Sequence, residues 1–122
     1  MAMNLLGGAS TSRLFMNVRE KQSLCYYCGA AAHRATGAMM IDSGVEPGKV
    51  MQAAAAMLAE WEGLKKGPIT QEEMDDCRSG LLSGMDALED SLSALEGWYY
   101  GQILRGEPLY PPAYGKELTT VR

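Results

Sequence analysis

The sequence predicts an α+β fold, in which one antiparallel hairpin of two strands combines with four helical stretches. Apolar residues recur every three to four positions in several segments, which is the period of an amphipathic helix. Two apolar segments between residues 23 and 45 lack this period and are separated by a turn sequence that contains Gly37. The chain has 122 residues, of which 47% are hydrophobic and 21% charged. This size and composition are typical of one globular domain.

The first predicted helix covers residues 12–22. Gly7 and Gly8 interrupt a short apolar start, and the Ser/Thr cluster after them supplies residues that favour a helix N-terminus. Leu14, Phe15 and Val18 then fall on one side of a helix. We therefore expect a three-turn amphipathic helix here.

A hairpin is predicted next. Residues 23–33 contain aromatic residues and cysteines without helical spacing, which favours a strand. Residues 34–37 form a plausible turn, and residues 38–45 are predicted as a second strand, antiparallel to the first. Because both edges of a two-stranded sheet can pair with more strands, we expect either a longer natural chain or a homodimer formed through an exposed sheet edge.

Helices are predicted after the hairpin. Pro47 suits the first turn of a helix that continues to residue 66, and Thr70 with Glu73 has the spacing of a capping box. The apolar face of the first of these helices is predicted to comprise Val50, Ala54, Met57, Leu58, Trp61 and Leu64. The next helix is predicted to carry an apolar stripe of Met74, Cys77, Leu81, Met85, Leu88, Leu92 and Leu95.

That second stripe is long, and we expect a break in the helix near Asp90 and Ser91. Trp98 and Tyr99 extend the apolar surface beyond it. Residues 108–114 are rich in proline and tyrosine and are predicted as a loop. Residues 116–122 are predicted to begin another element.

Charge and hydropathy narrow the function classes. The chain has 11 basic and 15 acidic residues, a net charge of −4, so nucleic acid and an anionic membrane are not expected as partners. No apolar run reaches the ~18–20 residues that span a bilayer. The N-terminal residues lack the basic and apolar regions of a signal peptide, so a cytoplasmic protein is expected.

The numbers of histidine and cysteine residues limit the metal and thiol sites that the chain can form. His33 is the single histidine, so a zinc site with two histidines cannot form within the chain. Cys25 and Cys28 have CxxC spacing, but on a strand they would point to opposite faces. We therefore expect Cys25, Cys28 and Cys77 to be reduced and free of metal. A zinc site built from these three thiols and His33, or a thiol-redox module, is a third and weaker interpretation.

A family resemblance emerges from residues 6–8, 12–15 and 19–27. These segments read Leu-Gly-Gly, Ser-Arg-Leu-Phe and Arg-Glu-Lys-Gln-Ser-Leu-Cys-Tyr-Tyr. They resemble the non-catalytic, or "inactive", C-terminal domain of insulinase-like (pitrilysin) zinc peptidases, and similarity continues over nearly the whole chain. Within the family, the Leu-Cys-Tyr-Tyr variant is most similar to a bacterial branch associated with modification of elongation factor P.

The resemblance implies a two-layer sandwich in which helices cover an antiparallel sheet, as in the mitochondrial-processing-peptidase-like metallohydrolase domain. Relatives have additional elements before and after the matched segment, so residues 1–122 are expected to be one truncated domain. The family's zinc motif HxxEH is absent from this sequence. No cofactor is expected in this chain, and zinc is expected only in a separate catalytic domain.

The resemblance also implies a site. Arg19, and Tyr26 seven positions later, match an arginine and a tyrosine that face the substrate across the family's chamber. From the residues alone, Arg19 could equally be a solvated charge and Tyr26 a rim aromatic. The expected function is a chamber domain that contacts a peptide substrate and pairs with an N-terminal catalytic half. The alternative is a pseudo-enzyme that binds a sister subunit in a protein-modification pathway.

Overall fold

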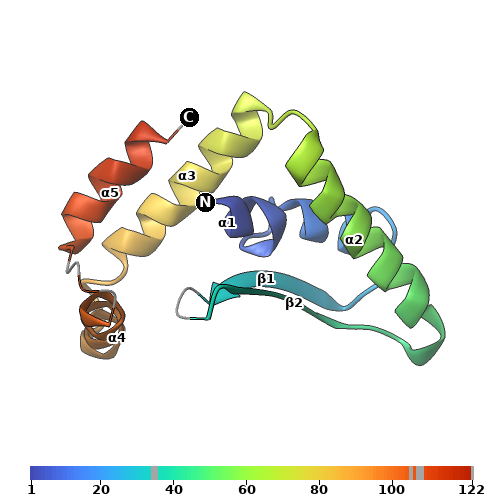
Figure 1. Cartoon of the computed structure of the whole chain (residues 1–122), viewed down its shortest axis with the longest axis horizontal. Coiled ribbons are helices and arrows are strands. Elements are labelled where there is room, and N and C mark those ends of the chain that lie inside the picture. Colours follow the sequence, from blue (N-terminus) through green and yellow to red (C-terminus); the bar gives the residue numbers. More distant parts are fainter. Residues whose placement is uncertain (34–35, 105, 107–108, 122) are drawn as a thin grey trace. The chain divides into compact units, whose positions relative to one another are not determined.

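The computed structural model (Figure 1) describes residues 1–33, 36–104, 106 and 109–121. The chain divides into two units. The first unit is Met1–Cys77 and the second is Arg78–Arg122. Each is described by itself. The first contains a two-stranded sheet with helices packed on it, and the second is helical in its described part.

The predicted hairpin is confirmed. Strand β1 (Tyr27–His33) pairs antiparallel with β2 (Ala38–Gly44) in continuous register. Gly37 adopts φ 68° in the connecting turn, a conformation that glycine reaches without steric cost. Arg34 and Ala35 of the predicted turn lie outside the described residues.

The first strand begins later than predicted, because the chain turns at Ser23. Ser23 has φ 50°, and the amide of Leu24 donates to the Val18 carbonyl at 3.1 Å. This turn buries Leu24, which is 4% exposed. Residues 23–26 therefore form a connection instead of a strand, and the chain joins the sheet where the Tyr26 amide donates to the Gly44 carbonyl at 2.8 Å.

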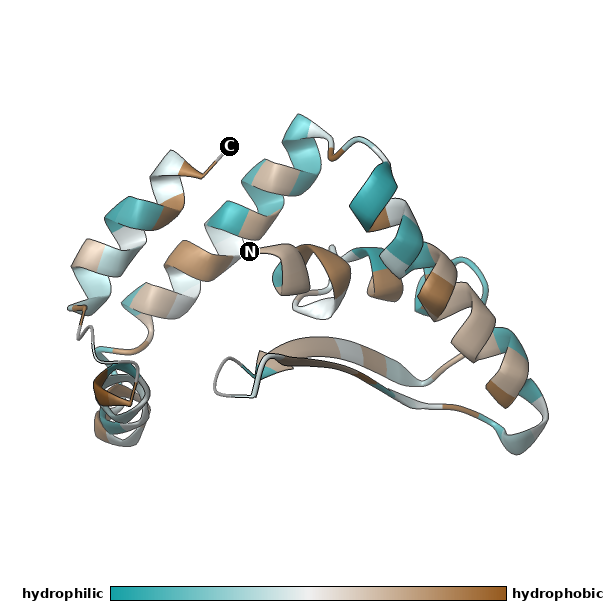
Figure 2. Ribbon diagram, viewed as in Figure 1, coloured by the Kyte–Doolittle hydropathy of each residue, from teal (hydrophilic) through white to brown (hydrophobic). Residues whose placement is uncertain are grey.

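Two helical segments pack on β1. They are α1 (Ala2–Gly7) and η1 (Leu14–Glu20). Segment η1 lies within the predicted first helix and is a π-helix. A π-helix has hydrogen bonds between residues five apart, and here the Lys21 amide donates to the Met16 carbonyl at 3.1 Å. Leu14 and Val18 are fully buried, as the apolar pattern predicts. Figure 2 shows apolar residues on α1 and along both strands.

The contact between α1 and β1 requires a glycine. A Cβ atom on Gly7 would lie 2.6 Å from the Ala30 amide nitrogen and 2.9 Å from the Gly29 carbonyl carbon. These are backbone atoms of β1, which cannot move aside as a flexible side chain can. Gly7 therefore allows the end of α1 to rest directly on the strand.

The predicted helix over residues 47–66 is present as the short 3₁₀ turn η2 (Pro47–Lys49) followed by α2 (Val50–Lys66). Its predicted face is only partly correct. Met57 and Leu64 are buried as predicted, whereas Val50, Ala54 and Leu58 are exposed, and Ala53 is buried in place of Ala54. The reason is that α2 packs on η1 and α1 along a narrow stripe, which the alanine-rich sequence does not specify.

Helix α3 (Gln71–Asp86) begins with the predicted capping box. The Glu73 amide donates to the Thr70 hydroxyl at 3.1 Å, and the Thr70 amide donates to the Glu73 carboxylate at 2.8 Å. The predicted break is also confirmed, because α3 ends before residue 90 and α4 (Leu92–Ile103) starts after the cap residue Ser91. The long apolar stripe is wrong as a single face, since Leu92 is 87% exposed.

The second unit contains a helix where a loop was predicted. Residues Pro111–Thr120 form α5, because a proline fits the first turn of a helix and can start one. Pro108 and Arg122 of the predicted C-terminal segments lie outside the described residues. The Trp98 indole donates to the Leu109 carbonyl at 3.1 Å. Among the described residues of both units, no helix is long and apolar enough to cross a membrane.

Candidate functional site

A cavity of about 340 Å³ lies in the first unit, where the end of η1, the connection at residues 23–26 and the start of η2 meet. Its lining residues come from these three segments and are mostly polar: Arg19, Glu20, Ser23, Leu24, Cys25, Tyr26, Glu46 and Lys49. The structure thus brings the two sequence-predicted site residues, Arg19 and Tyr26, to one cavity.

Arg19 is positioned by the last turn of η1. Its guanidinium carbon lies 4.4 Å from the centroid of the Phe15 ring, a cation–π contact. Its Nη1 lies 3.7 Å from the Glu20 carboxylate, and its side chain is 38% exposed. The guanidinium is therefore held in place on one side and open to solvent on the other.

Tyr26 occupies the bend just before β1. Its hydroxyl donates a hydrogen bond to Glu46 Oε1 at 3.1 Å, and the side chain remains open to solvent. A phenol that donates its proton still has lone pairs on the oxygen. Tyr26 can therefore accept a hydrogen bond from a ligand without losing Glu46.

Glu46 and Lys49 complete the site, and the sequence did not identify either of them as a site residue. Lys49 Nζ lies 3.2 Å from Glu46 Oε2. Hydrogen bonds from Lys49 and then from Tyr26 lower the pKa of the Glu46 carboxyl, so this group stays ionised. The hairpin register was the signal that could have found them: because Tyr27 pairs with Gly44, residues just after β2 lie opposite those just before β1.

The arrangement suits a peptide backbone. Arg19 offers donors for a carbonyl oxygen, and the Tyr26 oxygen offers an acceptor for an amide hydrogen. Both acidic and basic side chains line the cavity, so its lining does not select for one sign of charge.

The two cysteines of the CxxC sequence lie on different segments of the chain. Cys25 lies in the connection before β1, so the expectation that both cysteines lie on one strand is wrong. Burial, followed by the charge of Cys25 and a hydrogen bond with it, raises the pKa of the Cys28 thiol to about 12. Cys25 and Cys28 are half-buried, Cys77 is buried, and all three are free thiols.

The described residues do not fit a zinc ion. No three of their histidine, cysteine, aspartate or glutamate side chains are grouped as metal ligands. His33 is at the far end of β1, and Cys77 lies in α3 with its sulfur 3.8 Å from the Met1 carbonyl oxygen. The set of three cysteines and His33 that the sequence allowed is therefore not assembled.

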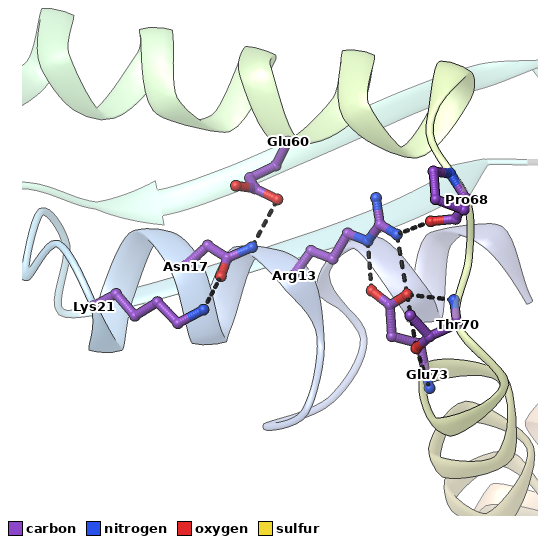
Figure 3. Close-up of polar contacts among 7 residues, drawn as sticks. All are labelled: Arg13, Asn17, Lys21, Glu60, Pro68, Thr70 and Glu73. Carbon is purple, nitrogen blue, oxygen red and sulfur yellow. Dashed lines mark hydrogen bonds and ion pairs between the residues drawn. The ribbon is translucent and has the colours of Figure 1, made fainter.

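A polar network fixes η1, the helix that carries Arg19 (Figure 3). The Arg13 guanidinium donates to both oxygens of Glu73, at 2.6 and 3.0 Å, and to the Pro68 carbonyl at 3.0 Å. This pair is only partly exposed, and Arg13 lowers the pKa of the Glu73 carboxyl to about 2. The start of η1 is thereby tied to the start of α3.

The same helix is tied to α2. The Asn17 side-chain amide donates to the Glu60 carboxylate at 2.9 Å, and Lys21 donates to the Asn17 side-chain oxygen at 2.9 Å (Figure 3). Contacts at Arg13 and Asn17 therefore hold η1, the helix that carries Arg19, to α3 and α2.

Comparison with known proteins assigns the family. Residues 1–81 match the model of the Peptidase M16 inactive domain. The chain belongs to this family. The resemblance to insulinase-like peptidases is thus confirmed, and the chain is a non-catalytic M16 inactive domain of a protease-like protein.

Two relatives come from Bacillus subtilis (strain 168). "Probable inactive metalloprotease YmfF" is 30% identical over 98 residues, which cover 80% of this chain and 23% of the relative. "Uncharacterized zinc protease YmxG" is 27% identical over 107 residues, which cover 85% of this chain and 26% of the relative. The chain therefore spans about a quarter of the length of the curated relatives it matches.

Solved structures share the fold. A conserved protein from Enterococcus faecalis V583 has a TM-score of 0.84 at 24% identity, covering 99% of this chain and 29% of its own. A putative zinc protease from Bordetella pertussis Tohama I has a TM-score of 0.77 at 18% identity. The match covers 99% of this chain and 68% of the protease chain. A Helicobacter pylori protease has a TM-score of 0.80 at 20% identity, covering 98% and 30%. These likenesses confirm the α+β fold.

Proposed function

We propose that this domain closes the substrate chamber of an M16 protein and holds an extended peptide through Arg19 and Tyr26. A separate N-terminal catalytic half would supply the zinc ion and perform the hydrolysis, in the cytoplasm. The observation that supports this most is the meeting of Arg19 and Tyr26, from two different segments, at one solvent-open cavity of an M16 inactive domain.

The role of each side chain follows from its hydrogen-bonding capacity. Arg19 donates to a peptide carbonyl, with its guanidinium kept in place by Phe15. Tyr26 accepts from a peptide amide, while Glu46 orients its hydroxyl. Both contacts involve the backbone of the peptide, so they bind a range of sequences and leave selectivity to other parts of the chamber.

Two substitutions in the full-length protein test this role. Arg19→Ala and Tyr26→Phe should each weaken binding of a fluorescein-labelled unstructured peptide about 3- to 10-fold, since each removes one hydrogen bond to the ligand. The measurement is fluorescence polarisation, together with peptide turnover where the protein is active. Thermal unfolding should change little, because Tyr26 is 67% exposed and the Arg19 side chain is 38% exposed.

Matched controls are available in the same unit. Tyr27→Phe removes an exposed phenol one residue away, and Lys66→Ala removes an exposed cation at the end of α2; neither lines the cavity. Both controls should bind peptide like the wild type. Equal binding by all four variants would refute the peptide-contact role.

The second candidate function is a pseudo-enzyme partner that binds a sister subunit. It is favoured by the relative described as a probable inactive metalloprotease. An HxxEH motif in the rest of the natural protein, with zinc-dependent cleavage, would support the chamber domain of an active peptidase. Lack of that motif, with co-purification of a motif-bearing homologue, would support the partner role.

A further inference from the structure

Lys49 lines the cavity together with Arg19 and Tyr26, and its contacts connect it to the proposed peptide site. Its Nζ lies 3.2 Å from Glu46 Oε2, while the other oxygen of the same carboxylate, Oε1, accepts the Tyr26 hydroxyl at 3.1 Å. One carboxylate therefore links the lysine to the tyrosine, and each of the two partners contacts its own oxygen atom.

The short turn η2 fixes the lysine and the glutamate relative to each other. Glu46 is the residue before η2 and Lys49 is its last residue, and the Lys49 amide donates to the Glu46 carbonyl at 2.9 Å. Side chains three residues apart lie on the same side of a 3₁₀ turn, which favours the observed ion pair. Tyr26 is held separately, since its amide donates to the Gly44 carbonyl at 2.8 Å. Because hydrogen bonds fix the backbone of both segments, the direction of the phenol depends on Glu46.

The positions of the protons leave the Tyr26 oxygen as an acceptor. Hydrogen bonds from Lys49 and then from Tyr26 lower the pKa of the Glu46 carboxyl, so this group is an ionised carboxylate, which accepts hydrogen bonds and donates none. The single O–H of Tyr26 is therefore used on Glu46, and only the lone pairs of the phenol oxygen remain for a ligand. Arg19, in contrast, has donors and no acceptor.

We propose that Lys49 and Glu46 are positioning residues that fix Tyr26 as a hydrogen-bond acceptor, so that the site selects peptides with a free backbone N–H at the position that meets Tyr26. This inference deepens the proposed function and rests on it. A proline or an N-methylated residue has no hydrogen on its nitrogen and is excluded at that position. The selection acts on the backbone of the peptide and leaves its side chains free to vary.

Loss of the ion pair should alter the site without unfolding the unit. The side chains of Glu46 and Lys49 are about half exposed, and exposed ion pairs contribute little to stability. Lys49→Met removes the ammonium group and keeps an unbranched side chain, whereas Lys49→Arg keeps a positive charge and its donors. Lys66→Met is the matched control, because Lys66 forms an ion pair with Glu62 on α2 and neither residue lines the cavity.

The first test observes the tyrosine in the absence of peptide. The full-length protein is isotopically labelled at the tyrosine Cζ carbon for NMR, and the Tyr26 resonance is assigned by its loss in Tyr26→Phe. Since this carbon responds to hydrogen bonding of the hydroxyl, Glu46→Ala and Lys49→Met should both shift the resonance. Lys49→Arg should restore it, and Lys66→Met should leave it in place. A resonance that stays unshifted in Glu46→Ala or in Lys49→Met would overturn the positioning role, whether or not the protein binds peptide.

The second test varies the peptide. Fluorescence polarisation compares a fluorescein-labelled unstructured peptide with a version whose amides are all N-methylated, which keeps every carbonyl and offers no amide hydrogen. Wild type, Lys49→Arg and Lys66→Met should bind the methylated version about 3- to 10-fold more weakly, the loss of one hydrogen bond. This difference should disappear in Tyr26→Phe and shrink in Glu46→Ala and Lys49→Met, where the phenol is free to turn and donate to a carbonyl.

The two measurements separate the ways in which the inference can fail. If Lys49→Met weakens the binding of both peptides by the same factor, the lysine contacts the peptide directly and its positioning role is overturned. If the resonance shifts as expected but Arg19→Ala and Tyr26→Phe bind both peptides normally, the proposed function fails, and the selection for a free N–H fails with it. The positioning of Tyr26 by Glu46 and Lys49 would in that case be supported.

Discussion

The two units of the chain differ in how much apolar surface they bury. In the first, Leu6, Leu14 and Val18 are fully buried between the helices and the sheet. In the second, Pro111 and Leu118 of α5 are buried, but Leu92 and Ile103 of α4 are exposed. The M16 inactive-domain match covers residues 1–81, almost the same stretch as the first unit. The candidate site therefore lies on the first unit, which is the unit with the larger packed core.

The largest expected effect tests this difference in packing directly. Leu14→Ala should lower the free energy of unfolding by about 2–5 kcal/mol, because it removes a fully buried side chain and leaves a cavity. Leu92→Ala, at a position that is 87% exposed, should change it by less than about 0.5 kcal/mol. Urea denaturation followed by circular dichroism measures both.

The substitution is the same in the two variants, so intrinsic helix propensity cancels and only burial differs. Similar losses in both would show that Leu92 is covered in solution and that the contrast between the units is false. A negligible loss for Leu14→Ala would instead contradict the packed core beneath the site.

Sequence predicted the features that depend on neighbouring residues. The capping box of Thr70 and Glu73 involves residues three apart, and the hairpin needs only a turn between two short strands. The Arg19 and Tyr26 pair came from the family resemblance, and the structure brings both to one cavity. Whether they bind a peptide stays a prediction.

Features that depend on distant residues were missed. Glu46 lies near Tyr26 because of the register in which β1 pairs with β2. Arg13 contacts Glu73, which is 60 positions later in the sequence. Nothing local distinguishes these charges from solvated ones. The helix α5 was missed for another reason, since prolines favour both a loop and the first turn of a helix.

The next effect in size concerns acid. The Glu73 carboxyl has its pKa lowered to about 2 by Arg13, from an ordinary value of 4.5. The pair therefore stabilises the first unit fully above about pH 4.5, and this contribution disappears as the pH falls from about 4.5 to about 2. Glu73→Gln should cost about 2 kcal/mol at pH 7 and flatten the dependence of stability on pH below 4.5.

Glu62→Gln is the matched control, because Glu62 pairs with Lys65 and Lys66 on the exposed side of α2 with 46% of its side chain open to water. Its effect should be much smaller than that of Glu73→Gln, because solvent screens an exposed ion pair. Hydrogen exchange compares the two units in the wild type. As the pH is lowered, the amides of η1 should lose protection from exchange before those of α4. Equal effects of the two substitutions would contradict the special role of Arg13 and Glu73.

Two glycines replaced by alanine should have effects of opposite sign, one in each unit. Gly7→Ala places a methyl group against the backbone of β1, 2.6 Å from the Ala30 nitrogen, and should destabilise by about 1–3 kcal/mol. Gly97→Ala adds a methyl group with no atom within 4 Å in the helix α4 and should stabilise by about 0.5–1 kcal/mol. Melting temperatures measured side by side show the two signs.

Two outcomes would contradict this contrast between the units. A neutral Gly7→Ala would mean that α1 does not rest on β1. A destabilising Gly97→Ala would mean that this face of α4 is covered in solution.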